Sequence, residues 1–127
     1  MAKLFKCIIV DDEEDALFML ENMLSDYDDI ELCGSYNNTA DAITAIMNIK
    51  PELCFLDIRM PQRDGFWLIE ELHKADINTE VIFCTAYKEY IIKAIRSAAF
   101  DFLLKPVNPE DLDNCLNRLR IRETKEN

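Results

Sequence analysis

The residues in this sequence that are best suited to chemistry are carboxylates that follow strand-like apolar runs. Asp57 comes directly after the run Leu53–Leu56, and Asp11 and Asp12 come directly after Phe5–Val10. Aspartate is also a common turn residue, so Asp57 taken alone does not distinguish a turn from a functional site. Ligands of open α/β sheets bind outside the carboxyl ends of the strands, so the other strand ends decide between these readings.

Two further strand-like runs end in polar side chains of different chemistry. Residues 81–84 lead into Thr85, and residues 100–104 lead into Lys105. Right-handed crossover connections bring the carboxyl ends of parallel strands to one edge of the sheet. Thr85 and Lys105 are therefore predicted to lie close to the three aspartates.

Three clustered carboxylates repel one another unless a pKa rises or a cation binds. Lys105 supplies one positive charge, and Mg²⁺ is the cofactor that suits the remaining oxygen ligands. A carboxylate held beside Mg²⁺ and a lysine can attack phosphorus and form an aspartyl phosphate. The metal and the lysine would neutralise charge on the phosphoryl oxygens, and a hydroxyl such as Thr85 could donate to them.

The elements that must position these side chains alternate along the chain. Apolar runs of strand length are separated by segments with helical spacing, and the last helix begins at Pro109 after the capping residue Asn108. The predicted strands cover residues 5–10, 30–36, 53–56, 81–84 and 100–104. This pattern predicts a single α/β domain in which a doubly wound, five-stranded parallel sheet is covered by helices on both faces.

Helical spacing also predicts what the helices bury and where they end. The first helix is predicted to bury a stripe made of Ala16, Met19, Leu20, Met23 and Leu24. The acidic residues in its first turn, Glu13 to Asp15, are explained by the positive end of the helix dipole. The fourth helix is predicted over residues 90–98, and residues 123–127 are predicted to be a frayed polar tail.

The charge of the chain opposes direct binding to nucleic acid. Asp and Glu number 25 against 14 Lys and Arg, which gives a net charge of −11. The one basic concentration, at Arg118, Arg120 and Arg122, is interpreted as a solvated helix end where cations complement the dipole.

Composition excludes several other classes of protein. With 2 glycines there is no glycine-rich phosphate loop, and neither a membrane-spanning run nor a signal peptide is evident, so a cytoplasmic protein without membrane contact is expected. The five cysteines are odd in number and form no C-x-x-C pair, which favours buried thiols in a reducing compartment over a zinc site. The single histidine, His73, is predicted to face solvent.

Taken together, these motifs resemble the receiver domain of bacterial two-component response regulators, over residues 5 to about 121. They are Asp11-Asp12-Glu13, Asp57-Ile58-Arg59-Met60-Pro61 with Asp64-Gly65, Thr85-Ala86 and Lys105-Pro106. The resemblance implies a flavodoxin-like (βα)5 fold with strand order 2-1-3-4-5. It also implies a receiver domain at residues 1–121, with residues 122–127 as a polar tail or the start of a linker to an output domain.

The same resemblance implies roles for the acidic residues. Asp57 corresponds to the phosphoacceptor, and Asp12 and Asp57 correspond to direct Mg²⁺ ligands. Asp11 assists, through water, and Arg59 corresponds to the position whose backbone carbonyl also binds the metal. A domain of this kind is a phosphoacceptor that assists its own phosphorylation and dephosphorylation, not an enzyme with turnover.

The resemblance further implies a switch. Thr85 and Lys105 correspond to the switch hydroxyl and the phosphate-binding lysine, and the Lys105–Pro106 peptide bond is expected to be cis. Phe102 corresponds to the aromatic switch position, where tyrosine is common. Phosphorylation by a sensor histidine kinase is expected to change the face made by the fourth helix, the fifth strand and the fifth helix, through which the protein could form a homodimer.

A narrower resemblance concerns the output. Tyr87-Lys88-Glu89-Tyr90, Ala94 and the segment 99–106 are similar to receivers of LytTR-type transcription regulators. This similarity implies control of a LytTR-type DNA-binding domain. The alternative is a stand-alone receiver that acts by protein–protein contact or as a phosphorelay intermediate.

Two side chains bear on the lifetime of the phosphorylated state. Arg59 and Tyr87 lie two residues beyond Asp57 and Thr85, at positions that in the family influence hydrolysis of the phosphoryl group. Both are large, and the hypothesis is that they hinder the attacking water and prolong the phosphorylated state. The alternative is that both are exposed polar residues.

Three rival classes fit less well. A haloacid-dehalogenase-type phosphatase needs a second acid two residues after its nucleophile, where this chain has Arg59. A flavodoxin-like cofactor module would have hydroxyls and glycine after the first strand, where this chain is acidic. An interaction module that works without phosphorylation usually lacks part of the acid–threonine–lysine set, which is complete here.

Overall fold

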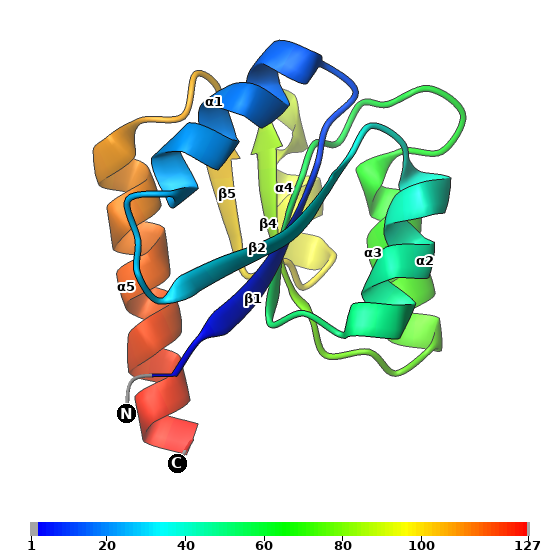
Figure 1. The fold of residues 1–127 in the computed structure, drawn as a ribbon. Coiled ribbons are helices and arrows are strands. Elements are labelled where there is room, and N and C mark those ends of the chain that lie inside the picture. The colour runs from blue at the N-terminus through cyan, green and yellow to red at the C-terminus, as the bar shows by residue number, and fades with distance from the viewer. Residues whose placement is uncertain (1–2, 127) are drawn as a thin grey trace.

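The computed structural model describes residues 3–126, which form a central sheet between two layers of helices (Figure 1). The strands are β1 (Phe5–Val10), β2 (Ile30–Tyr36), β3 (Leu53–Leu56), β4 (Glu80–Thr85) and β5 (Asp101–Leu104). The helices are α1 (Glu14–Leu24), α2 (Thr39–Ile49), α3 (Gly65–Lys74), α4 (Ile91–Arg96) and α5 (Pro109–Glu126), with a 3-10 turn, η1 (Lys88–Tyr90), before α4.

All neighbouring strands pair in parallel, in the order β2-β1-β3-β4-β5. This confirms the predicted doubly wound sheet and its strand order. The central strand β3 is buried along its whole length, as its unbroken apolar run predicts. Because every crossover returns the chain to the same end of the sheet, the carboxyl ends of all the strands share one edge.

Alternation along the strands divides the core into two halves. In β1, Cys7 and Ile9 face the layer formed by α1 and α5, whereas Ile8 and Val10 face the layer formed by α2, α3 and α4. Figure 1 shows α1 and α5 on one side of the sheet and α2 and α3 on the other. Since successive side chains of a strand point to opposite faces, a single short strand contributes to both halves.

The buried stripe of α1 is narrower than predicted. Met19, predicted to be buried, has 52 % of its surface exposed, and Leu20 and Leu24 make the buried contacts, with Leu17 and Met23 packed beside them. Residues 17, 20 and 24 recur at i, i+3 and i+7, so this stripe faces the sheet and Met19 lies off it. The prediction for Met19 was therefore wrong.

The last two helices also differ from the sequence prediction. The regular part of α4 covers only Ile91–Arg96, because η1 precedes it and Ala98 adopts a left-handed φ of 64° after it. The helix α5 continues through residues 123–126, where a frayed tail was expected. That residues 122–127 begin a linker stays a prediction, of which Asn127 lies outside the described residues.

The structure confirms the expected burial of four of the five cysteines and the expected exposure of His73. Cys7, Cys54, Cys84 and Cys115 are buried free thiols, and the free thiol Cys33 on the edge strand β2 is half-buried. His73 is exposed near the end of α3. Within residues 3–126, no helix is both long and apolar enough to cross a membrane.

Candidate functional site

The backbone fixes the strand ends beside one another. The Asp57 amide donates to the Val10 carbonyl at 3.0 Å, and the Lys105 amide donates to the Thr85 carbonyl at 2.8 Å. The Asp11 amide donates to the Tyr36 carbonyl at 3.0 Å in the same way. These bonds continue the sheet ladder by one residue, so the first polar residue after each strand is held as rigidly as the strand itself.

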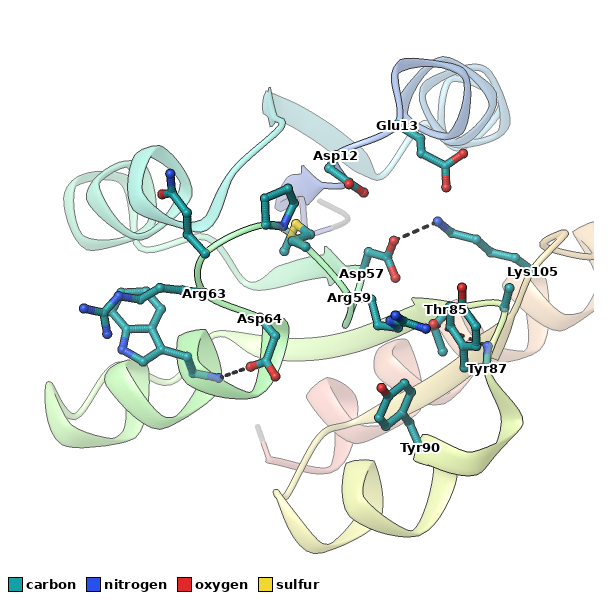
Figure 2. A pocket seen from close by; sticks show the side chains of 15 residues that line it. Asp12, Glu13, Asp57, Arg59, Arg63, Asp64, Thr85, Tyr87, Tyr90 and Lys105 are labelled. Atoms are coloured by element: carbon teal, nitrogen blue, oxygen red, sulfur yellow. Dashed lines mark hydrogen bonds and ion pairs between the residues drawn. The ribbon is translucent and has the colours of Figure 1, made fainter.

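Lys105 joins two of the predicted aspartates. Its Nζ lies 2.5 Å from Asp11 Oδ2 and 3.1 Å from Asp57 Oδ2, and Figure 2 shows the lysine directed at Asp57 across the pocket. Both carboxylates are buried, each with 6 % exposure. Their other oxygens accept from backbone amides, Asp57 Oδ1 from Ile58 at 2.7 Å and Asp11 Oδ1 from Glu13 at 3.0 Å. Every oxygen of this pair is thus oriented by a donor.

The two carboxylates of Asp11 and Asp57 carry more negative charge than Lys105 alone neutralises. Burial raises the pKa of the Asp57 carboxyl; Lys105 opposes that rise and the charge of Asp11 adds to it. Burial works against the charged form of Lys105, but its hydrogen bond to Asp11 and the negative charges of Asp57 and Asp11 outweigh this and raise its pKa. One ammonium therefore serves two carboxylates, which leaves negative charge to attract a cation.

Four acidic side chains at this edge could hold such a cation. One carboxylate oxygen from each of Asp11, Asp12, Glu13 and Asp57 lies within 4.8 Å of the others. An all-oxygen set that is open to water on one side fits the preference of Mg²⁺, which binds through carboxylates and keeps several waters. The sequence prediction named three of these residues for the metal and attributed Glu13 to the helix dipole alone. The position of Glu13, between Asp12 and the first turn of α1, was the signal for its place here.

Thr85 and Phe102 lie on the side of the sheet that α4 covers. Thr85 is fully buried, and its Oγ1 accepts a long hydrogen bond of 3.4 Å from the Tyr87 amide. In the register of β4 and β5, Thr85 lies beside Leu104 and Phe83 lies beside Phe102, so Phe102 is a diagonal neighbour of Thr85. Phe102 is half-buried and packs against the core on the α4 side, outside the pocket. The Lys105–Pro106 peptide bond is cis.

The pocket above these residues has a volume of about 980 Å³ and is walled by two stacked pairs. The Arg59 guanidinium lies 4.6 Å from the centre of the Tyr87 ring, next to Asp57 and Thr85. The Arg63 guanidinium lies 4.7 Å from the Trp67 ring on the opposite wall (Figure 2). The floor is therefore acidic with one central lysine, whereas the rim carries basic and aromatic groups.

The arrangement is thus a rigid edge with a buried carboxylate, a group of acids that could hold a cation, a lysine and a hydroxyl. Residues 7–117 match the family described as the response regulator receiver domain. Among curated proteins, the chain is 39 % identical over 123 residues to the transcriptional regulatory protein BtsR of Salmonella typhi, covering 97 % of this chain and 51 % of that protein. It is 42 % identical over 114 residues to an uncharacterized response regulatory protein of Shewanella oneidensis, covering 90 % of this chain and 48 % of that one.

Solved structures agree with the sequence comparison. The response regulatory domain of protein mrkE from Klebsiella pneumoniae superimposes with a TM-score of 0.86 at 30 % identity, covering 94 % of this chain and 98 % of that domain. The chain spans about half the length of the curated relatives that it matches. The matched family covers the sheet edge and all the residues described above, so this chain belongs to the response regulator receiver domains of two-component signalling.

Proposed function

We propose that this domain receives a phosphoryl group on Asp57. The observation that carries the proposal is the bridge that Lys105 makes between Asp11 and Asp57, inside a group of four acids. Asp57 Oδ2, which accepts the 3.1 Å bond from Lys105, would attack phosphorus of a phosphohistidine on a sensor kinase, or of a small phosphodonor. A P–O bond forms to Asp57 as the P–N or P–O bond of the donor breaks, and the leaving group keeps the electron pair.

Mg²⁺ would be held by Asp12 and Asp57 directly, by Asp11 through water and by the backbone carbonyl of Arg59. When bound, it neutralises charge on the transferring phosphoryl oxygens. The chain's own residues supply the rest of the environment. Lys105 can leave Asp57 for a phosphoryl oxygen at small cost because it keeps its shorter contact to Asp11. The buried Asp57 is already oriented by the Ile58 amide, which reduces the loss of entropy on reaction.

The switch would begin at Thr85. Its hydroxyl oxygen accepts one long bond from the Tyr87 amide, so its O–H could donate to a phosphoryl oxygen on Asp57, which is a strong acceptor. A shift of Thr85 toward Asp57 would open space on the sheet face where Phe102 is the diagonal neighbour. Phe102 has no hydroxyl to hold it outside, so it would respond to that space by packing alone. The populations of the inactive and active conformations of the face formed by α4, β5 and α5 would then change.

The proposed output rests on the exposed surface of α4 and on the names of the relatives. Ile92 and Ile95 on α4 are 63 % and 70 % exposed, and Ile95 lines a groove together with Phe100 and Phe102. An apolar surface of this kind suits a second copy of the domain. Since one relative is named a transcriptional regulatory protein and the chain spans about half of it, we propose a DNA-binding output of the LytTR type beyond residue 121. The second candidate is a stand-alone receiver or phosphorelay intermediate, located in the cytoplasm in either case.

The experiment that tests the central claim is phosphorylation of a single carboxylate. The wild-type domain, incubated with acetyl phosphate and Mg²⁺, should gain the mass of one phosphoryl group. Asp57→Asn should abolish this gain while the circular dichroism spectrum stays the same. Asp76→Asn is the control, because Asp76 lies outside the pocket after α3 and asparagine tolerates its left-handed φ of 56°. Labelling of Asp57→Asn at the wild-type rate would refute the proposal.

A further inference from the structure

One buried polar side chain has no part in the site as described so far. The buried polar side chains among residues 3–124 are Asp11, Asp57 and Thr85, which belong to the site, and Thr39. Thr39 is 3 % exposed and lies in the first turn of α2. Its hydroxyl donates to the Arg63 carbonyl at 3.1 Å, in the segment that leads from Asp57 to α3. A buried hydroxyl of α2 is therefore bonded to the wall of the phosphorylation pocket.

That wall contains a strained turn. Gln62 has a φ of 70° although it is not a glycine, and the Arg63 amide donates to the Pro61 carbonyl at 2.9 Å. This is a γ-turn of the positive-φ kind, which is rare and strained. Strained backbone persists only where its surroundings hold it, and such sites cluster where geometry matters for function.

Several contacts hold the segment from within. The Gly65 amide donates to the Ile58 carbonyl at 2.8 Å, and Asp64 caps α3 by accepting from the Trp67 amide at 3.0 Å, as Figure 2 shows. These bonds fix the two ends of the segment. Thr39 holds its middle, because the carbonyl that it binds belongs to the residue directly after the strained Gln62.

We propose that Thr39 is a positioning residue for phosphoryl transfer: its hydroxyl ties α2 to the turn at Gln62 and so fixes the pocket wall beside Asp57. This inference rests on the proposed function. The wall begins at Arg59, whose backbone carbonyl is the proposed metal ligand, and a turn that relaxes at Gln62 would shift that carbonyl. Loss of the hydroxyl therefore acts on metal affinity, although Thr39 touches neither the metal nor the phosphoryl group.

The test compares Mg²⁺ binding in matched variants, followed by the fluorescence of Trp67, the single tryptophan, which lines the pocket. Thr39→Val keeps the shape of the side chain and removes the hydroxyl, and it should raise the Kd for Mg²⁺ roughly 3- to 10-fold, as expected for one lost hydrogen bond. Thr39→Ser should stay near wild type. Thr79→Val is the control, because it removes a similar hydrogen bond, of 2.8 Å to the Pro51 carbonyl, away from the pocket.

A second variant tests the strain itself. Gln62→Gly makes the positive φ accessible without strain, so Thr39→Val/Gln62→Gly should bind Mg²⁺ more tightly than Thr39→Val alone. In the metal-free protein, the Gly65 amide should exchange its hydrogen faster in Thr39→Val than in wild type. The exchange measurement requires neither metal nor phosphorylation.

The outcomes separate this inference from the proposed function. Equal Kd values for wild type and Thr39→Val, or equal losses in Thr39→Val and Thr79→Val, would overturn the role of Thr39. So would a Thr39→Ser variant as weak as Thr39→Val. If the wild-type domain takes no phosphoryl group from acetyl phosphate, the proposed function fails, whereas the coupling of Thr39 to the turn can still be measured by exchange.

Discussion

At the scale of single residues, the site combines rigid parts with adjustable ones. The backbone amides of Asp57 and Lys105 donate to carbonyls of neighbouring strands, so the sheet fixes the positions of both residues. Arg59 and Tyr87 are exposed side chains on loops, and they are held by stacking on one another at 4.6 Å. The rigid pair is suited to the chemistry common to the family, and the stacked pair is suited to setting its rate in this chain.

The stacked pair leads to a prediction about the lifetime of the phosphorylated state. Because Arg59 and Tyr87 close one side of the pocket, Arg59→Asn/Tyr87→Ala should shorten the lifetime of phosphorylated Asp57. A factor of roughly 2 to 5 is expected from the usual contribution of an exposed cation–π contact. The measurement is loss of labelled protein after removal of the phosphodonor.

The control for this prediction is the other stacked pair. Arg63→Asn removes the guanidinium over Trp67 on the opposite wall and keeps the backbone carbonyl that Thr39 binds. It should leave the lifetime close to that of the wild type. A lifetime that does not shorten in Arg59→Asn/Tyr87→Ala would contradict the shielding role.

At the scale of elements, α5 is fastened by its arginines. Arg118 pairs with Asp101 of β5, Arg120 with Asp29 before β2, and Arg122 with Glu80 of β4. The sequence interpretation took these cations as a solvated helix end. Arg118 and Arg122 are exposed, as expected, and each of the three arginines also pairs with an acid from a different segment that the last turns of α5 approach.

The Asp29–Arg120 pair predicts how stability depends on pH. Arg120 donates two bonds, from Nε at 2.6 Å and from Nη2 at 2.9 Å, and these hydrogen bonds lower the pKa of the Asp29 carboxyl below its usual 3.8. A lowered carboxyl pKa adds stability that is present above the usual value and is lost as pH falls through the folded-state value. Asp29→Asn should therefore cost roughly 1 kcal/mol at pH 7.

This cost should shrink below about pH 4, where the wild-type carboxyl also takes up a proton. Urea denaturation at several pH values measures it. Asp28→Asn changes the neighbouring exposed carboxylate and should show little effect at any pH. A cost for Asp29→Asn that does not change between pH 7 and pH 3 would argue against the ion pair.

A second prediction at this scale concerns α4. In this six-residue helix Ala94 is the buried residue, and Ile92 and Ile95 point away from the core. If α4 mediates self-association, Ile95→Glu should weaken dimer formation in beryllofluoride and Mg²⁺ by about tenfold or more, because a carboxylate would have to lose its water. Sedimentation velocity with and without beryllofluoride measures this.

A matched control uses another exposed apolar residue. Met47 is 41 % exposed and lies on α2, which is not part of the proposed interface of α4, β5 and α5. Met47→Glu should therefore dimerise as the wild type does. Equal dimerisation of Ile95→Glu and wild type would remove α4 from the interface.

At the scale of the whole molecule, the net charge of −11 dominates. Asp12 and Glu13 line the pocket around Asp57, whereas the arginines at the end of α5 are already paired with acids. Each of these three arginines therefore has an acid beside it that a phosphate backbone would have to displace. A DNA-binding activity of the full-length protein would have to come from a further domain.

The domain alone should accordingly fail to bind duplex DNA at physiological salt, with or without beryllofluoride. Fluorescence anisotropy with a labelled duplex measures this, and a basic DNA-binding protein serves as the positive control. Binding that weakens with added salt in the expected linear manner would show that a basic surface has been overlooked.

The order of strands and helices, and the residues at the strand ends, follow from the amino-acid sequence without a structure. Hydrophobic periodicity is a local property of the sequence, so it predicts the strands directly. Right-handed parallel crossovers then place the carboxyl ends of all the strands at one edge, which predicts that Asp57, Thr85 and Lys105 lie together. The resemblance to receiver domains then supplied the roles of individual side chains.

The contacts between segments that are distant in sequence could be identified only from the three-dimensional arrangement of the chain. The bridge from Lys105 to Asp11 and the bond from Thr39 to Arg63 depend on loop geometry, which residue spacing does not encode. The exposure of Met19 depends on how α1 is rotated against the sheet. Each of these contacts forms only when two independently placed elements meet, so no local pattern contains it.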